Sequence, residues 1–341
     1  MKISSLFAIT LIALSLTTGA RAEASEKVDY RAEMRQWIQA VSAYANQKNP
    51  AFIVVPHRGE ELLTVTGKAD GEPATGYIAA IDGQSFEGVF YGHSQLNIPT
   101  SSSERGRLLK FIEVATAGQL RPMVIDYCFT RQYVENSIAW NQSRNYLAFA
   151  ADHIELNSIP PFPQDPPNVN KDDVADLAAA KNFLCLATAR SFSDKASYVN
   201  SIAKTNYDLV ILEPFYQKEP LTSDDLQALK KKANGGQRLV MAYLKVGLAD
   251  HSLPYWQESW QPGAPSWLAE KSIGSVHDFY VQYWDPAWQQ MIMGAESSLL
   301  DQILKTQYDG VFLDGVDVYK HFEREEAKPA SGEAAEANPK Q

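Results

Sequence analysis

Eight short apolar runs constrain the fold of this 341-residue chain more than any other feature of its sequence. Each run has the length of one strand and is apolar throughout, which is typical of strands buried on both faces. The runs are residues 51–56, 86–91, 123–128, 146–150, 182–186, 209–212, 238–246 and 310–313. The sequence therefore predicts eight strands of a parallel sheet that is covered by helices.

Helical patterns lie between these runs. Residues 31–48 place apolar side chains on one helical face, and Thr222 starts a capping motif for a helix that we expect to end at Gly235. Ser297 precedes a further helical face. No glycine-rich nucleotide-binding turn follows any run, which weighs against a doubly wound dinucleotide fold. We expect an α/β protein built as a single-domain (β/α)8, or TIM, barrel.

The two ends of the chain differ from its middle. Residues 1–22 combine Lys2, a short apolar core and the small-x-small sequence Ala20-Arg21-Ala22, which predicts a signal peptide cut after Ala22. The mature protein is then secreted or periplasmic. Residues 23–322 form the expected barrel domain, with a proline-rich link at about 159–170, and residues 323–341 are expected to be disordered.

Charge and composition exclude several classes of binding partner. The net charge is −10 and no basic stripe is visible, so nucleic acid is not an expected partner. No segment beyond the signal peptide has 18 unbroken apolar residues, so no membrane span is expected. The six histidines lack paired ligand spacing, and we expect neither metal nor another cofactor. Cys128 and Cys185 lie in apolar runs and are predicted to be buried free thiols, a disulfide being the alternative.

Acidic and tyrosine side chains stand where the predicted strands end. In TIM barrels the active site lies at the carboxyl ends of the strands. The residues there are Glu87, Asp126, Glu213, Asp250, Asp314, Asp317, Tyr91, Tyr127 and Tyr243. Carboxylates that converge on one mouth raise one another's pKa values, and glycoside hydrolysis needs one protonated and one ionised carboxyl group. We therefore expect a glycoside hydrolase that acts on a polysaccharide.

Some of these residues have plainer interpretations. Asp317 is either a sugar ligand or the cap of a helix that begins at Val318, and Asp285 is expected to cap a helix at Pro286. Asp208 and Asp309 precede their strands and are expected in turns at the opposite end. The aromatic stretch 255–288 either packs against the barrel or stacks on sugar rings, for which Trp256 and Trp284 are the best placed.

Taken together, several segments resemble the endo-α-1,4-polygalactosaminidase-like proteins of glycoside hydrolase family 114, which were once labelled extracellular cysteinyl-tRNA-synthetase-related. The matching segments are residues 205–213, 242–250, 255–256, 265–268, 281–288, 308–317, 49–56, 59–63, 81–83 with Glu87 and 91–92, and 124–128. The resemblance extends over nearly the whole mature chain. The order of the segments implies a circularly permuted barrel that runs strands five to eight before strands one to four, which a closed barrel tolerates.

The resemblance implies a catalytic pair formed by Asp314 and Glu87. It assigns Glu87 as general acid and Asp314 as nucleophile or base, or the reverse, on an α-1,4-linked galactosamine polymer whose positive charge suits an acidic cleft. The chain departs from the family pattern around this pair. His57, Arg58, Glu213 and Leu248 stand where other residues are expected, and all should border the substrate. The alternative is therefore a non-catalytic carbohydrate-binding or cell-surface protein on the same barrel.

Overall fold

The computed structural model describes residues 27–328, so the predicted signal peptide lies outside the described residues. All eight predicted strands are present, and each pairs in parallel with its neighbours. One sheet has the order β1-β13-β9-β6-β5 and the other the order β2-β3-β4. The bounds are β1 Ile53–Pro56, β2 Gly83–Glu87, β3 Arg121–Tyr127, β4 Leu147–Ala151, β5 Phe183–Leu186, β6 Leu209–Leu212, β9 Leu239–Lys245 and β13 Gly310–Asp314.

The two parallel sheets approach each other at β1 and β2. His57 and Ser85 form an isolated parallel bridge there, and the Asp82 amide donates to the Val54 carbonyl at 2.9 Å. Beyond the ends of β4 and β5, the Ala187 amide donates to the Leu156 carbonyl at 2.8 Å. The molecule is thus an α/β protein whose main strands are all parallel.

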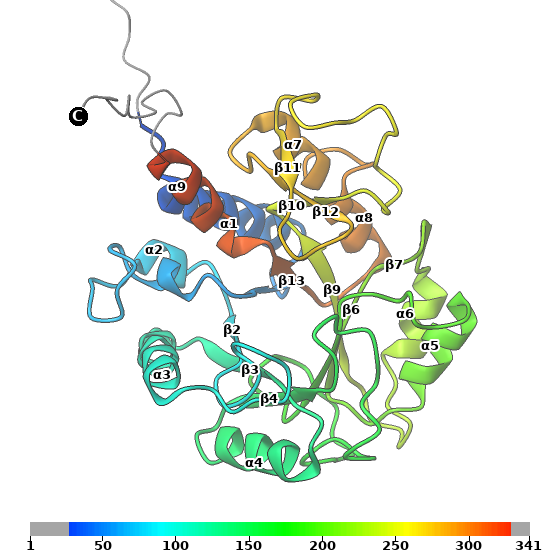
Figure 1. Cartoon of the computed structure of the whole chain (residues 1–341). Helices are drawn as coiled ribbons and strands as arrows, with labels where there is room; N and C mark the ends of the chain where they lie inside the picture. The colour runs from blue at the N-terminus through cyan, green and yellow to red at the C-terminus, as the bar shows by residue number, and fades with distance from the viewer. Residues whose placement is uncertain (1–26, 329–341) are drawn as a thin grey trace, which may run out of the picture.

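Helices surround these strands (Figure 1). They are α1 Tyr30–Lys48, α2 Thr75–Ile78, α3 Ser102–Ala117, α4 Arg131–Gln142, α5 Lys195–Ala203, α6 Ser223–Leu229, α7 Pro286–Ile292, α8 Leu299–Thr306 and α9 Tyr319–Ala327, with 3-10 turns at Glu60–Leu63 and Val316–Val318. The first helix starts where the Asp29 side chain accepts from the Ala32 amide, and it buries Met34, Trp37 and Ile38. Several helices cover apolar strands: α3 packs against β2 and β3, α4 against β4, and α8 against β9.

A further sheet, which is antiparallel, was not predicted. Strands β10 Leu248–Asp250, β12 Asp278–Val281 and β11 Leu268–Lys271 pair in that order within the long connection that follows β9. The small hairpin β7 Phe215–Tyr216 and β8 Glu219–Pro220 follows β6. In the aromatic stretch, Trp267 and Trp288 are buried and their ring centroids lie 5.0 Å apart, so these indoles pack inside the protein.

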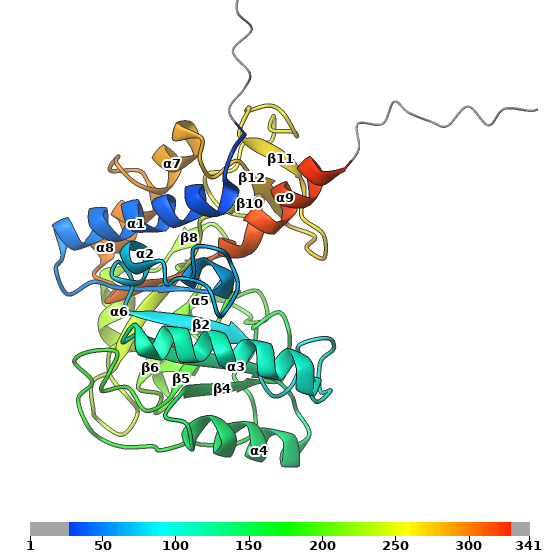
Figure 2. The same ribbon diagram turned by 90° about the vertical axis from the view of Figure 1, so that its left-hand side faces the viewer.

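Several predicted boundaries were wrong. The second strand ends at Glu87, because the chain turns at Gly88 and Gly92, both with positive φ, where the structure leaves no room for a side chain on Gly92. The helix after Thr222 ends at Leu229. The predicted disordered tail begins too early: α9 continues to Ala327 and lies beside α1 (Figure 2). Glu323 of α9 forms a two-pronged ion pair with Arg31 of α1.

Other predictions are confirmed. The proline-rich link lies in an irregular segment without helix or strand between Ala151 and Phe183. Cys128 and Cys185 are buried free thiols. Asp285 caps α7 by accepting from the Ala287 amide at 2.7 Å. Asp208 lies in the bend before β6, as expected, and is fully buried and paired with Lys232.

Candidate active site

A cavity of about 630 Å³ lies at the carboxyl ends of the parallel strands. Most of the predicted site residues line it, and we call it the cleft. These residues are His57, Arg58, Glu87, Tyr127, Glu213, Tyr243, Asp250, Asp314 and Asp317. They come from β1, β2, β3, β6, β9, β10, β13 and the turns beside them. The structure therefore brings together side chains that are far apart in the sequence, as strand ends in a parallel sheet require.

Glu87 is held by three neighbours. Arg58 forms an ion pair with one carboxylate oxygen, and the Tyr127 hydroxyl donates to the other. His57 Nε2 lies 3.0 Å from that second oxygen, while its Nδ1 lies 3.1 Å from the Ser85 hydroxyl. Burial alone would raise the pKa of Glu87, but the Arg58 charge and these hydrogen bonds outweigh burial and hold the pKa below its ordinary value. Glu87 is ionised in this arrangement.

Arg58 reaches the cleft from an unusual backbone conformation. Its φ is +61°, in the left-handed region that side chains other than glycine seldom adopt, and Gly59 follows with φ +66°. The charges of Glu87, Asp317 and Asp314 all raise the pKa of the guanidinium, against the effect of burial. One cation therefore faces three carboxylates.

Asp314 and Asp317 both line the cleft, and the charges of both act on Arg58. Asp314 ends β13, and Asp317 lies in the 3-10 turn Val316–Val318. Burial, the charge of Asp314 and a hydrogen bond to it raise the pKa of the Tyr243 hydroxyl. Helix α9 has no side-chain cap, so the alternative in which Asp317 caps this helix is wrong. Both carboxylates are half-buried and face the cleft.

A separate group of charges lies between β9 and the antiparallel sheet. Lys245 Nζ lies 2.9 Å from Asp250 Oδ2 and 2.6 Å from Asp278 Oδ1. Arg190 also approaches Asp250, at 3.4 Å. Burial raises the pKa of Asp250, whereas the charge of Lys245 lowers it. The resulting pKa is about 2. Asp250 is thus occupied by protein cations.

Glu213 follows β6 and is nearly buried, with 8% of its surface exposed. Its Oε2 accepts from the Ala189 amide at 2.6 Å. Burial raises the pKa of Glu213 to about 7, and the opposing effects of Ala189, Arg190 and Lys245 are smaller. It is the cleft carboxyl group that can be protonated near neutral pH.

Three predicted site residues lie outside the cleft. Asp126 is fully buried and accepts from the Phe90 and Tyr91 amides, Ser137 and Asn141. Successive strand residues point to opposite faces, so Asp126 must point towards α4 once Tyr127 points into the cleft. Tyr91 accepts from Asn136 and stacks on Tyr133, so its role is packing.

Trp284 also lies away from the cleft. It packs against Phe322 of α9 and Tyr30 of α1, with ring centroids 4.8 and 5.2 Å away. Trp256 packs against Phe279 and Trp260. Both tryptophans are half-buried in these contacts, and neither lines the cleft.

The sequence prediction missed the cleft cations other than Arg58. Lys245 ends β9, and Arg190 follows β5, so both stand at strand ends as the carboxylates do. A search of strand ends for all charged residue types would have found them. Asp278 had no such signal, because it lies on the unpredicted antiparallel strand β12.

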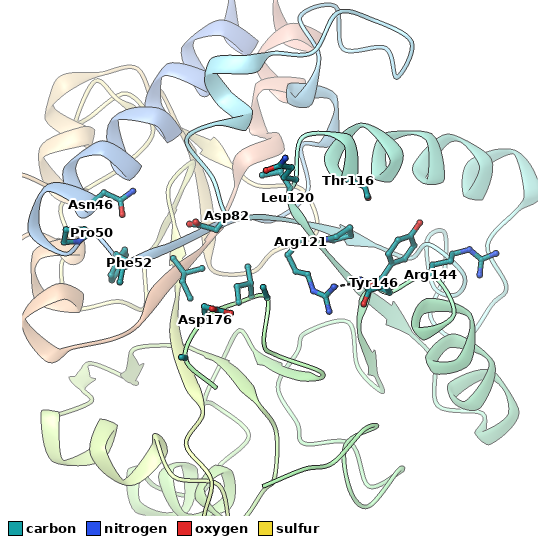
Figure 3. A pocket seen from close by; sticks show the side chains of 18 residues that line it. Asn46, Pro50, Phe52, Asp82, Thr116, Leu120, Arg121, Arg144, Tyr146 and Asp176 are labelled. Atoms are coloured by element: carbon teal, nitrogen blue, oxygen red, sulfur yellow. Dashed lines mark hydrogen bonds between the residues drawn. The ribbon is translucent and has the colours of Figure 1, made fainter. Parts of the chain in front are cut away.

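A second cavity of about 630 Å³ lies at the amino ends of β1, β3 and β4. Figure 3 shows Arg121 and Tyr146 in its wall, with Asp82 and Asp176 nearby. Arg121 donates to the Asn145 carbonyl at 2.8 Å, and its Nε finds no hydrogen-bond partner among residues 27–328. Parallel α/β sheets bind their ligands at the carboxyl ends of the strands, so this cavity at the amino ends is a secondary candidate.

Within the described residues, one cluster has the spacing of metal ligands. Glu270 of β11 and His321 and Glu325 of α9 place one ligand atom each within 4.8 Å of one another. His321 is buried and lies 3.2 Å from Glu270, whereas Glu325 already pairs with Lys328 at 2.5 Å. Two exposed carboxylates of this kind are common without an ion.

No family model matches the chain. An uncharacterized protein of Deinococcus radiodurans is 32% identical over 128 residues, 37% of this chain and 38% of the relative. Uncharacterized protein MJ1477 of Methanocaldococcus jannaschii is 27% identical over 158 residues, 45% and 42% of the two chains. An uncharacterized protein of Thermotoga maritima is 25% identical over 126 residues, 36% and 37%. The chain thus matches less than half the length of these curated relatives, whose names state no activity.

None of the helices in residues 27–328 is long and apolar enough to cross a membrane.

Proposed function

We propose that the protein is an exported glycoside hydrolase that cleaves an amino-sugar polysaccharide with carboxyl groups of the cleft. The observation that carries the proposal is the cleft itself, in which Glu87, Glu213 and Asp314 meet at the carboxyl ends of parallel strands in three different environments. Hydrolysis of a glycosidic bond needs carboxyl groups of unequal proton affinity. A purely structural strand end has no use for such a set.

The fold that we propose is a closed (β/α)8 barrel. The bridge between His57 and Ser85 and the sequential order of the strands support closure between β1 and β2. The contact between Ala187 and Leu156 supports closure between β4 and β5. Circular permutation is part of the same proposal. A linear alignment can follow only one half of a permuted chain, and the matches to relatives cover 36–45% of this one.

The resemblance assigns catalysis to Asp314 and Glu87. Glu87 is ionised here by Arg58, and a general acid needs a proton, so the structure favours an ionised role for Glu87. Asp314 is half-buried beside Tyr243 and has no ion-pair partner among the described residues, which suits a nucleophile or base. Asp317, which also lines the cleft, suits a ligand for a hydroxyl or ammonium group of the sugar.

The test is the release of reducing ends from partially deacetylated galactosaminoglycan, with chitosan and other amino-sugar polymers beside it. We expect the wild type to cleave at least one polymer, and Asp314→Asn and Glu87→Gln to lose about 100-fold or more of that activity. Asp285→Asn is a matched control, because this residue caps α7 outside the cleft and asparagine also caps helices. Full activity in Asp314→Asn, with folding verified by circular dichroism, contradicts the assignment.

A second candidate function is glycan binding without cleavage. The observation that favours it is the Arg58–Glu87 ion pair, which occupies a presumed catalytic carboxylate with a protein cation. Binding of a polymer by the wild type, measured by calorimetry, without reducing-end release from any polymer establishes this alternative.

A further inference from the structure

Glu213 differs from Glu87 and Asp250, two other carboxylates of the cleft, in that it pairs with no cation of the described residues. Glu87 pairs with Arg58, and Asp250 pairs with Lys245. No lysine, arginine or histidine of residues 27–328 forms an ion pair with Glu213. Its single side-chain hydrogen bond comes from the Ala189 amide and engages Oε2, which leaves Oε1 without a protein partner in the described structure.

Charged and phenolic side chains face Glu213, and the two cations among them act on its pKa without pairing with it. Lys245 and Arg190 lie nearby, but both direct their nitrogens at Asp250, 2.9 and 3.4 Å away. The charge of Asp250 itself raises the pKa of Glu213. Tyr198 of α5 donates to the Glu213 backbone carbonyl at 3.3 Å, and the Tyr243 and Tyr255 side chains line the narrow space beside it. Buried among these groups, the carboxyl group keeps its proton to a higher pH than any surface glutamate.

The position of Glu213 in the sheet allows it to act together with Asp314. In the order β1-β13-β9-β6, one strand, β9, separates the strand of Asp314 from the strand of Glu213. One strand, β1, likewise separates Asp314 from Glu87 through the His57–Ser85 bridge. Tyr243 belongs to β9, between the strands of Asp314 and Glu213, and it faces Asp314. Glu213 and Glu87 are therefore alternative partners on either side of Asp314.

We propose that Glu213, and not Glu87, protonates the oxygen of the leaving sugar. The proposal rests on the proposed hydrolase function and names the donor in that same cleft. Glu213 opens onto the cleft, pairs with no cation and has a free carboxyl oxygen, whereas Glu87 is committed to Arg58, His57 and Tyr127.

The step balances as an ordinary glycoside hydrolysis. The C1–O bond breaks, its electron pair stays on the leaving oxygen, and the Glu213 proton moves to that oxygen. Asp314 either forms the bond to C1 or removes a proton from the water that does. In the first case water then attacks C1, the C1–Asp314 bond breaks with its electron pair staying on Asp314, and ionised Glu213 takes the proton of that water. In the second case Asp314 releases the proton that it took from water to solvent, and solvent returns a proton to Glu213.

Leaving-group dependence tests the proposal. An oligosaccharide that the wild type cleaves is compared with its 2,4-dinitrophenyl glycoside, whose leaving group departs without a proton. We expect Glu213→Gln to lose about 100- to 10,000-fold in kcat/KM on the oligosaccharide but less than about 10-fold on the dinitrophenyl glycoside. Asp314→Asn and Glu87→Gln should lose activity on both substrates, and Asp285→Asn on neither.

The pH profile gives a second readout. Glu213 must be protonated to act, so cleavage of the oligosaccharide should fall as the pH rises through about 7. This alkaline limb should vanish when Glu213→Gln cleaves the dinitrophenyl glycoside. Glu213→Asp, which keeps an acid at the position, should restore part of the activity on the oligosaccharide and covers the case in which the amide variant does not fold.

Two outcomes overturn the proposal. If Glu87→Gln shows the leaving-group dependence and Glu213→Gln loses both substrates equally, Glu87 is the donor and the hydrolase function still stands. If the wild type cleaves no polymer and no activated glycoside, the hydrolase function fails together with its proton donor.

Discussion

At the scale of single residues, Arg58 combines a costly backbone with a central charge. A left-handed φ costs a residue with a Cβ atom about 1–2 kcal/mol, and such residues persist where the surroundings hold them in place. Here the ion pair with Glu87 holds the side chain across the cleft. The backbone therefore stores strain in order to place one cation among three carboxylates.

Replacing Arg58 separates these two effects. Arg58→Ala and Arg58→Gly both remove the ion pair, but only glycine also relieves the left-handed strain. We expect Arg58→Gly to have a free energy of unfolding about 1 kcal/mol higher than Arg58→Ala, because alanine keeps the unfavourable φ. Urea denaturation of the two variants measures this difference. Equal stabilities would mean that the backbone changes conformation once the arginine is gone.

At the scale of elements, local chemistry decided where several helices begin. Asp285 and Pro286 predicted the start of α7, and the structure confirms both the cap and its hydrogen bond to Ala287. Thr222 and Asp225 form the reciprocal capping box of α6. The end of α6 was harder to predict, because the chain leaves the helix to pair Lys231 with Gln237.

Removing the cap of α7 should show its energetic worth. Asp285→Ala deprives the Ala287 amide of its acceptor, so we expect a loss of about 1 kcal/mol in the free energy of unfolding. Asp285→Asn retains an acceptor oxygen and should stay within about 0.5 kcal/mol of the wild type. Thermal and urea unfolding of the pair provide the measurement, and an alanine variant as stable as the asparagine variant would refute the capping role.

At the scale of the whole molecule, a buried ion pair joins three distant parts of the chain. Lys232 and Asp208 lie 2.9 Å apart, and both side chains are fully buried. Lys232 also donates to the Asp172 carbonyl at 2.6 Å, and Asn170 donates to Asp208 at 3.0 Å. The irregular segment between β4 and β5, which has no helix of its own, is thereby fastened to the start of β6.

Breaking this pair should be costly. Lys232→Met leaves Asp208 buried without its cation, and we expect a loss of about 3–5 kcal/mol in the free energy of unfolding. The double variant Lys232→Met with Asp208→Asn removes both charges and should be more stable than Lys232→Met alone. Chemical denaturation of the three proteins tests this order, and a double variant less stable than the single one would contradict it.

The sequence by itself determined the eight parallel strands and most of the predicted site residues that line the cleft. Strand runs are local patterns of apolar side chains, and the residue that ends a run must lie at the edge of the sheet whatever its neighbours are. This is why Glu87, Glu213 and Asp314 were all placed correctly. The same locality allowed the prediction of two buried free thiols.

The tertiary structure alone decided which charges meet and which side chains turn away. Asp126 and Tyr127 are adjacent, yet only Tyr127 faces the cleft, because a shift of one residue reverses the direction of a strand side chain. The ion pair of Arg58 with Glu87 joins two different strands. Lys245 pairs with Asp278 of the antiparallel sheet, which no local sequence pattern predicted. The protonation of each carboxyl group follows from these partners and from burial, which arise only when distant segments pack together.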